Sequence, residues 1–129
     1  MRLFIGALLS IFAACGGTST TSSCDTAAIS LVCSIPSAGQ CVEYTGLSTA
    51  DSKNVTNFCN SNSGAVGTAA CTASGRVGTC TIPPTTPNTE INCSPNGTVT
   101  IRYYPPRYQT ASDAQSICST VSGSAFTPN

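Results

Sequence analysis

The sequence has no histidine and no tryptophan, and only 8% of its residues are charged. Histidine is the usual proton carrier in acid-base and nucleophilic catalysis and a frequent zinc ligand, so its absence argues against both kinds of site. Five basic and five acidic residues give a net charge of +0, and no cluster of lysine and arginine is present to bind a phosphate backbone. We therefore predict no enzyme activity, no metal, no cofactor and no nucleic acid partner.

The five acidic residues offer the remaining route to acid-base chemistry. Asp51 and Asp113 each stand three residues after a serine or threonine, which is typical of a helix start. Glu43 lies in a predicted strand, and Asp25 and Glu90 are scattered along the chain. A pair of carboxylates brought together by the fold is the one catalytic alternative that this pattern leaves open.

The chain opens on a short apolar leader. Met1-Arg2 supplies one positive charge, and residues 3–12 form an apolar stretch. Since a membrane-spanning helix needs about twenty apolar residues, this stretch is too short to remain in a bilayer. We expect residues 1–14 to be a signal peptide that is cleaved.

The residues around the expected cleavage point favour lipidation of Cys15. Ala13 and Ala14 supply the small side chains that a lipoprotein signal peptidase needs before its cysteine, although Phe12 occupies a position where an aliphatic residue is usual. Removal of Cys15 from the total also leaves an even number of cysteines. In the alternative, Cys15 is an ordinary leader residue and is discarded.

This segment resembles the relaxed lipobox of small cysteine-rich bacterial lipoproteins of the spirochaete type, and the resemblance covers the leader, the linker and, loosely, the rest of the chain. It implies that Cys15 carries a diacylglyceryl group and usually an N-acyl chain, which together anchor the protein durably to a membrane. Gly16 after the cysteine implies an outer-membrane location in the bacterial envelope, on either the periplasmic or the surface face.

Eight further cysteines are spread eight to twenty-five residues apart, without any Cys-x-x-Cys pair. Zinc sites usually bring paired ligands two to four residues apart, whereas an even, well-spread set in an exported chain is typical of disulfides. We predict up to four bridges, with the pairing left open, among Cys24, Cys33, Cys41, Cys59, Cys71, Cys80, Cys93 and Cys118.

Residues 15–23 combine the lipidated cysteine with a Gly/Ser/Thr tether, and residues 24–129 suit a single disulfide-rich domain. Because large apolar residues are scarce, the bridges must supply much of the stability. We predict the α+β class, with an antiparallel sheet of about four strands and two short helices.

Local patterns place the elements. Apolar alternation predicts strands at 40–45 and 99–103. Helix-start signals predict helices over 49–60 and after Thr110. Residues 25–33 suggest a short helix, although their β-branched side chains make this assignment ambiguous.

The region between the two halves suggests a hairpin. Residues 67–82 would turn at Gly75-Arg76 and set Cys71 opposite Cys80. The two cysteines would then bond to each other or point together at separate partners.

The two halves of the chain match at an offset of 59 residues, which predicts a two-fold strand-helix repeat with chance similarity as the alternative. Val42 and Cys59 correspond to Ile101 and Cys118. If the two strands pair side by side, Glu43 and Arg102 approach each other across the sheet.

The densest cluster of aromatic and basic residues lies at 102–108. Strand alternation sends Tyr103 inward, which leaves Tyr104, Arg107 and Tyr108 as candidate binding residues for a glycan or an extended peptide. The alternative is that the tyrosines pack in the core or cover the sheet.

These observations predict an envelope protein attached to the membrane through its lipid, which acts as a non-catalytic module binding a protein or glycan ligand. Two alternatives remain. One is a structural envelope component without a soluble ligand, and the other is a small disulfide-rich inhibitor whose stapled loop runs from residue 83 to 92.

Overall fold

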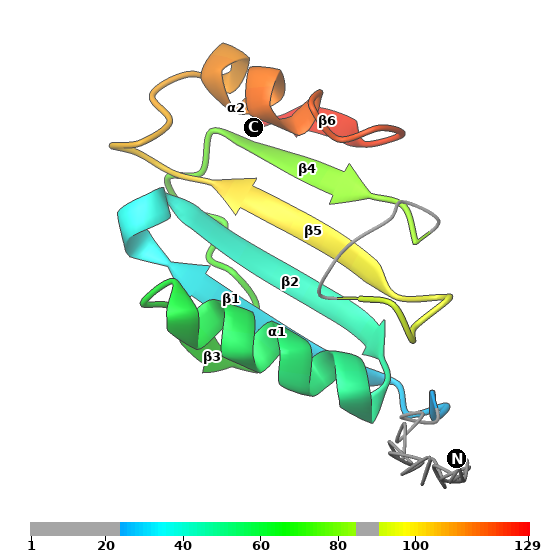
Figure 1. The fold of residues 1–129 in the computed structure, drawn as a ribbon. Coiled ribbons are helices and arrows are strands. Elements are labelled where there is room, and N and C mark those ends of the chain that lie inside the picture. The colour runs from blue at the N-terminus through cyan, green and yellow to red at the C-terminus, as the bar shows by residue number, and fades with distance from the viewer. Residues whose placement is uncertain (1–23, 85–90) are drawn as a thin grey trace, which may run out of the picture.

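The computed structural model describes residues 24–84 and 91–129. These residues form one six-stranded sheet in which all neighbouring strands are antiparallel, together with two α-helices and a short 3-10 helix (Figure 1). The α+β class is as predicted, with six strands where about four were expected. In chain order the elements are β1 (Ile29–Ile35), η1 (Pro36–Ala38), β2 (Gln40–Leu47), α1 (Thr49–Ser61), β3 (Ala65–Gly67), β4 (Gly78–Ile82), β5 (Thr98–Tyr103), α2 (Ala111–Cys118) and β6 (Ala125–Pro128).

The strands predicted at 40–45 and 99–103 are confirmed as β2 and β5, and both predicted helices are present as α1 and α2. The helix suggested for 25–33 is wrong. Much of that segment belongs to β1, which pairs with β2 on one side and β3 on the other. Its alternation sends Cys33 and Ile35 into the core, so β-branched residues and strand pairing prevail over the local helical pattern.

The hairpin predicted for 67–82 is also wrong. β3 lies at one edge of the sheet beside β1, whereas β4 lies between β5 and β6. Residues 68–77 therefore cross the sheet, and the segment that follows β3 runs behind it in the view of Figure 1. Gly75 keeps a positive φ of 75°, as a turn requires, but a turn residue does not determine which strands pair. Cys71 and Cys80 bond to separate partners.

The strand order β3-β1-β2-β5-β4-β6 confirms the predicted repeat and extends it. Each half of the chain is a ββαβ unit, β1-β2-α1-β3 and then β4-β5-α2-β6. The units meet where β2 pairs with β5, and Val42 pairs there with Ile101, its own equivalent at the offset of 59. The sheet therefore has a two-fold pseudo-symmetry centred on that pair.

Both helices cover the same face of the sheet. α1 packs on β1, β2 and β3, and α2 packs on β4 and β6 (Figure 1). A buried disulfide joins strand to helix in each unit, Cys33–Cys59 in the first and Cys80–Cys118 in the second. Between the helices and the sheet lies the apolar core, which includes Val42, Tyr44, Leu47, Val55, Val99, Tyr103 and Ala114.

Within the described ranges 24–84 and 91–129, no helix has both the length and the apolar character needed to cross a membrane.

Candidate functional site

A groove of about 460 Å³ opens on the face of the sheet that the helices leave uncovered. Because side chains alternate along a strand, the inward position of Cys33 places Val32 and Ser34 on this open face, and the inward position of Val42 places Cys41 there. All three line the groove. Its volume falls within the range typical of ligand-binding pockets.

One wall of the groove is the segment that crosses the sheet. The Cys41–Cys71 disulfide attaches this segment to β2, and the Tyr104 hydroxyl donates a hydrogen bond to the Thr72 carbonyl. Ala69 and Ala70 complete the wall with small apolar side chains. A covalent bond and a hydrogen bond therefore hold this wall in place without a ligand.

An ion pair under the crossing segment adds to its support. Arg102 Nη2 lies 2.8 Å from Glu43 Oε2, which confirms the predicted approach of these two residues across the sheet. Glu43 Oε1 also accepts a hydrogen bond of 2.8 Å from the Cys71 amide. Burial raises the pKa of Glu43, but hydrogen bonding to Arg102 and Cys71 outweighs this effect and leaves the pKa below its ordinary value.

The other wall follows β5 and consists of Tyr104, Pro105 and Pro106. Tyr104 donates its amide proton to the Gly39 carbonyl at 2.8 Å, which joins this wall to the turn between β1 and β2. Gly39 has a φ of 62°, and a Cβ at this position would lie 2.6 Å from Cβ of Arg107. A glycine is therefore required for the two segments to approach this closely.

The three predicted binding residues do not form one surface. Tyr104 lines the groove, and burial raises the pKa of its phenol above the ordinary value despite the opposing charges of Arg102 and Arg76. Arg107 is exposed and lies against Gly39, outside the lining. Tyr104 is thus the only one of the three that contributes to the groove.

Tyr108 is buried, and this position contradicts its prediction as a surface binding residue. Its ring packs edge-on against Tyr103 with 4.7 Å between the ring centroids, and its hydroxyl accepts a hydrogen bond of 3.0 Å from Gln40 Nε2. The inward position predicted for Tyr103 is confirmed, and burial raises the pKa of Tyr103 to about 12. Tyr108 therefore completes the core, where aromatic area is scarce.

Most of the groove residues gave no signal in the sequence. Val32, Ser34 and Gln40 come from β1 and β2, and Ala69 and Ala70 come from the segment expected in a hairpin. Only the disulfide pairing and the path of the crossing segment bring them together. The cluster of prolines and tyrosines after β5 was the one local indication of this site.

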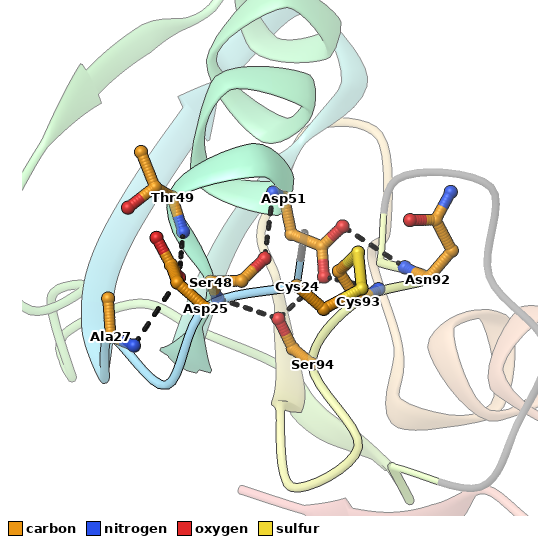
Figure 2. The surroundings of a disulfide bond; sticks show 9 residues. All are labelled: Cys24, Asp25, Ala27, Ser48, Thr49, Asp51, Asn92, Cys93 and Ser94. Atoms are coloured by element: carbon orange, nitrogen blue, oxygen red, sulfur yellow. Dashed lines mark hydrogen bonds between the residues drawn. A yellow bond between two sulfur atoms is a disulfide. The ribbon is translucent and has the colours of Figure 1, made fainter. Parts of the chain in front are cut away.

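A second polar cluster lies at the opposite end of β2, around the Cys24–Cys93 disulfide (Figure 2). The buried Asp51 carboxylate accepts hydrogen bonds from the Cys93 amide at 2.8 Å, from the Asn92 amide at 3.2 Å and from the Ser94 hydroxyl. Ser94 Oγ in turn accepts from the Ser48 amide at 2.7 Å. These bonds join the start of α1 to the segment before β5.

The acidic residues at this end serve the start of α1. The Ser48 side chain accepts from the Asp51 amide at 3.1 Å, which is the predicted helix-start arrangement. The exposed Asp25 carboxylate accepts from the Thr49 amide at 2.8 Å and from the Ala27 amide at 3.3 Å (Figure 2). Hydrogen bonding to the Thr49 side chain and amide holds the pKa of Asp25 below its ordinary value.

No group of three or more His, Cys, Asp or Glu side chains able to hold a metal ion occurs within residues 24–84 and 91–129. All eight cysteines predicted to form disulfides are bridged, as Cys24–Cys93, Cys33–Cys59, Cys41–Cys71 and Cys80–Cys118.

Several predictions concern residues outside those that the structure describes. They are the signal peptide 1–14, the lipidated Cys15, the tether 16–23 and, within the proposed inhibitor loop, residues 85–90 with Glu90.

Comparisons of the chain with protein-family models, with curated proteins and with solved structures found no match.

Proposed function

We propose that this protein is a non-catalytic binding module, tethered to the outer membrane of a bacterial envelope by lipid on Cys15, which holds a ligand in the groove of its open sheet face. The proposal is supported by the distance between the groove and Cys24, the first described residue, and by the chemistry of the groove lining.

The observation that carries the proposal is that the groove and Cys24, the first described residue, lie at opposite ends of the strands. Gln40, at the start of β2, lines the groove. Ser48, just after the end of β2, contacts Ser94 next to the Cys24–Cys93 bridge. The eight residues of β2 span about 26 Å, so a lipid anchor upstream of Cys24 would attach at the end of the strands farther from the groove.

The first described residue is covalently bonded to the body of the domain. Cys24 forms a disulfide with Cys93, which precedes β5, so tension along the tether passes through a covalent bond. Without this bridge, the same force would act on residues 25–32, which precede the next disulfide of the chain, at Cys33. The bridge therefore suits a domain that is held at its amino-terminal end.

The lining of the groove supports a binding role over a catalytic one. Among the described residues that line the groove, Tyr104 has the only titratable side chain, because Cys41 and Cys71 are in a disulfide, and burial raises the pKa of Tyr104 further from neutrality. General acid-base catalysis works best with a group whose pKa lies near the working pH. The groove can surround a ligand without offering such a group.

The anchor is tested by mass spectrometry and membrane fractionation of the native protein. We expect the mature chain to begin at Cys15, to carry the mass of the lipid and to sediment with membranes, whereas Cys15→Ala should not be lipidated. Ser22→Ala is the matched control and should behave as wild type. A native protein that begins at another residue, or that lacks lipid, would contradict the anchor.

The binding role is tested by photo-crosslinking in native cells with benzoylphenylalanine at position 106, in the groove wall, and at position 117, an exposed site on α2. We expect a discrete adduct from position 106 that Tyr104→Ala abolishes, and none from position 117. Absence of an adduct from position 106 would refute ligand binding in the groove and favour the structural alternative.

A further inference from the structure

We propose that the ligand of this groove is an uncharged, extended, proline-containing peptide segment of a partner protein. This inference rests on the binding role proposed above and names the class of its ligand.

The described lining of the groove contains no charged side chain. Its thirteen residues include no Asp, Glu, Lys, Arg or His, and the nearby Glu43 and Arg102 form an ion pair with each other. Arg76, whose charge also acts on Tyr104, lies outside the lining. A charged ligand would lose hydration on entering the groove without gaining an opposite charge from the lining. The electrostatically matched partner is therefore a segment without charge.

The walls suit an extended chain with apolar faces. Tyr104, Pro105 and Pro106 form one side, and the small Ala69 and Ala70 form the other. Polyproline II segments dock in such aromatic and apolar grooves because their conformation is already extended and loses little entropy on binding. The fixed walls lower the cost of binding in the same way, because the disulfide and the Tyr104 hydrogen bond already hold them.

The floor of the groove offers a hydrogen-bond donor for a peptide backbone. A polyproline II segment makes no internal hydrogen bonds, so its carbonyls need outside donors. The Ser34 hydroxyl lies on the open face and has no hydrogen-bond partner among residues 24–84 and 91–129. The Gln40 side chain alternates with Val42 onto the helix-covered face and donates to Tyr108 there, so it adds no donor to the groove. Ser34 therefore provides a donor for one ligand carbonyl.

A glycan matches this lining less well. Sugar hydroxyls require many polar partners, whereas the described lining offers only the side chains of Ser34, Thr72 and Tyr104 apart from the disulfide. The Tyr104 hydroxyl already donates to the Thr72 carbonyl. A buried hydroxyl left without a partner lowers affinity. The low polar content therefore favours a peptide.

The experiment measures fluorescence anisotropy with the mature protein in detergent micelles. The probe is a labelled twelve-residue Ala-Pro-Pro repeat with blocked ends, and the matched peptide carries Glu or Lys at every third position. We expect micromolar binding of the uncharged peptide and at least about tenfold weaker binding of either charged peptide. An N-acetylglucosamine hexamer and palmitic acid are tested as competitors and should have no effect.

Two groove variants and one control locate the binding. Tyr104→Ala should weaken binding at least about tenfold by removing one wall, and Ala70→Trp should block the groove at an exposed position that tolerates a larger side chain. Ile117→Ala, at an exposed apolar position on α2, should bind as wild type.

Equal binding of charged and uncharged peptides, displacement by the glycan or the fatty acid, or unchanged binding by Ala70→Trp would overturn the proposal. Self-association of the wild type that Ala70→Trp abolishes would also overturn it, by making a second copy the occupant. If the adduct from position 106 forms in cells but the peptide does not bind, the peptide class is wrong and the binding role stands. If neither is observed, both proposals fail.

Discussion

The two ββαβ units share their connectivity and their strand-helix disulfide, and one difference between them is the chain that joins the second strand to the helix. In the first unit β2 ends at Leu47 and α1 begins at Thr49, with Ser48 alone between them. In the second unit residues 104–110 separate β5 from α2. The longer connection supplies Tyr104 and the two prolines that form one wall of the groove.

The opposite wall also comes from chain outside the repeated elements, because residues 68–77 join the two units. The repeat thus supplies a scaffold of paired strands and two strand-helix bridges, while unrepeated segments shape much of the groove. The repeated elements thus hold most of the core and the two strand-helix bridges, whereas two unrepeated segments form the groove walls.

The largest expected effect comes from removing the equivalent disulfides. Cys33→Ala with Cys59→Ala, and Cys80→Ala with Cys118→Ala, each open a bridge between buried residues 26 or 38 positions apart. We expect each pair of substitutions to lower the free energy of unfolding by roughly 3–4 kcal/mol, because the unfolded chain gains freedom. Urea unfolding measures the free energy of unfolding of both variants. If removal of one bridge leaves it unchanged, the two bridges do not contribute equally to stability.

The next effect distinguishes the two helix starts. Asp51 is buried and accepts hydrogen bonds from three groups, so Asp51→Asn should leave donors unsatisfied and cost about 2–4 kcal/mol. Asp113 forms an exposed capping box with Thr110, so Asp113→Asn should cost far less. Urea unfolding measures the free energy of unfolding of both variants. Equal losses of stability would refute a special role for the hydrogen bonds around the buried Asp51.

A smaller effect concerns the ion pair that joins the units at the centre of the sheet. Glu43→Arg and Arg102→Glu, made singly, place like charges together beneath the crossing segment. The double variant should recover part of the lost stability, with a coupling energy of about 1 kcal/mol. A double-mutant cycle by urea unfolding measures this coupling. If the double variant loses as much as the two single variants combined, the pair contributes no net attraction.

The smallest effect is the dependence of stability on pH. The pKa values of Asp25, Glu43 and Asp113 are lowered in the folded protein, so their contribution is present above their ordinary values and is lost as the pH falls through the folded values. With no histidine, stability should be nearly constant between about pH 5 and 8 and decline below about pH 4.

Urea unfolding at several pH values measures this dependence. Glu43→Gln in the first unit and Asp113→Asn in the second should each reduce the decline in acid. A transition between about pH 6 and 8 would contradict the assignment of the pH dependence to these carboxylates.

Much of the scaffold was predictable because its signals are local. Apolar alternation at 40–45 and 99–103, and a Ser or Thr three residues before Asp51 and Asp113, depend on neighbours within a few positions. The equivalence of Val42 and Ile101 was also visible, since it needs only a comparison of the two halves. The groove was not predictable beyond Tyr104, because its walls depend on which strands become neighbours.

By itself, the sequence determined the spacing of apolar residues that predicts the strands β2 and β5 and the two helices. It also determined the two helix starts, the repeat, and the pairing of all eight of these cysteines in disulfides. The tertiary structure decided that β3 and β4 lie apart, that Tyr108 is buried, and which cysteines bond across separations of 26 to 69 residues. The physical reason is the distance along the chain over which each interaction acts. A local pattern reports the face that a residue presents, whereas a partner is chosen by the packing of the whole chain, in which distant segments compete for the same strand edge and the same thiol.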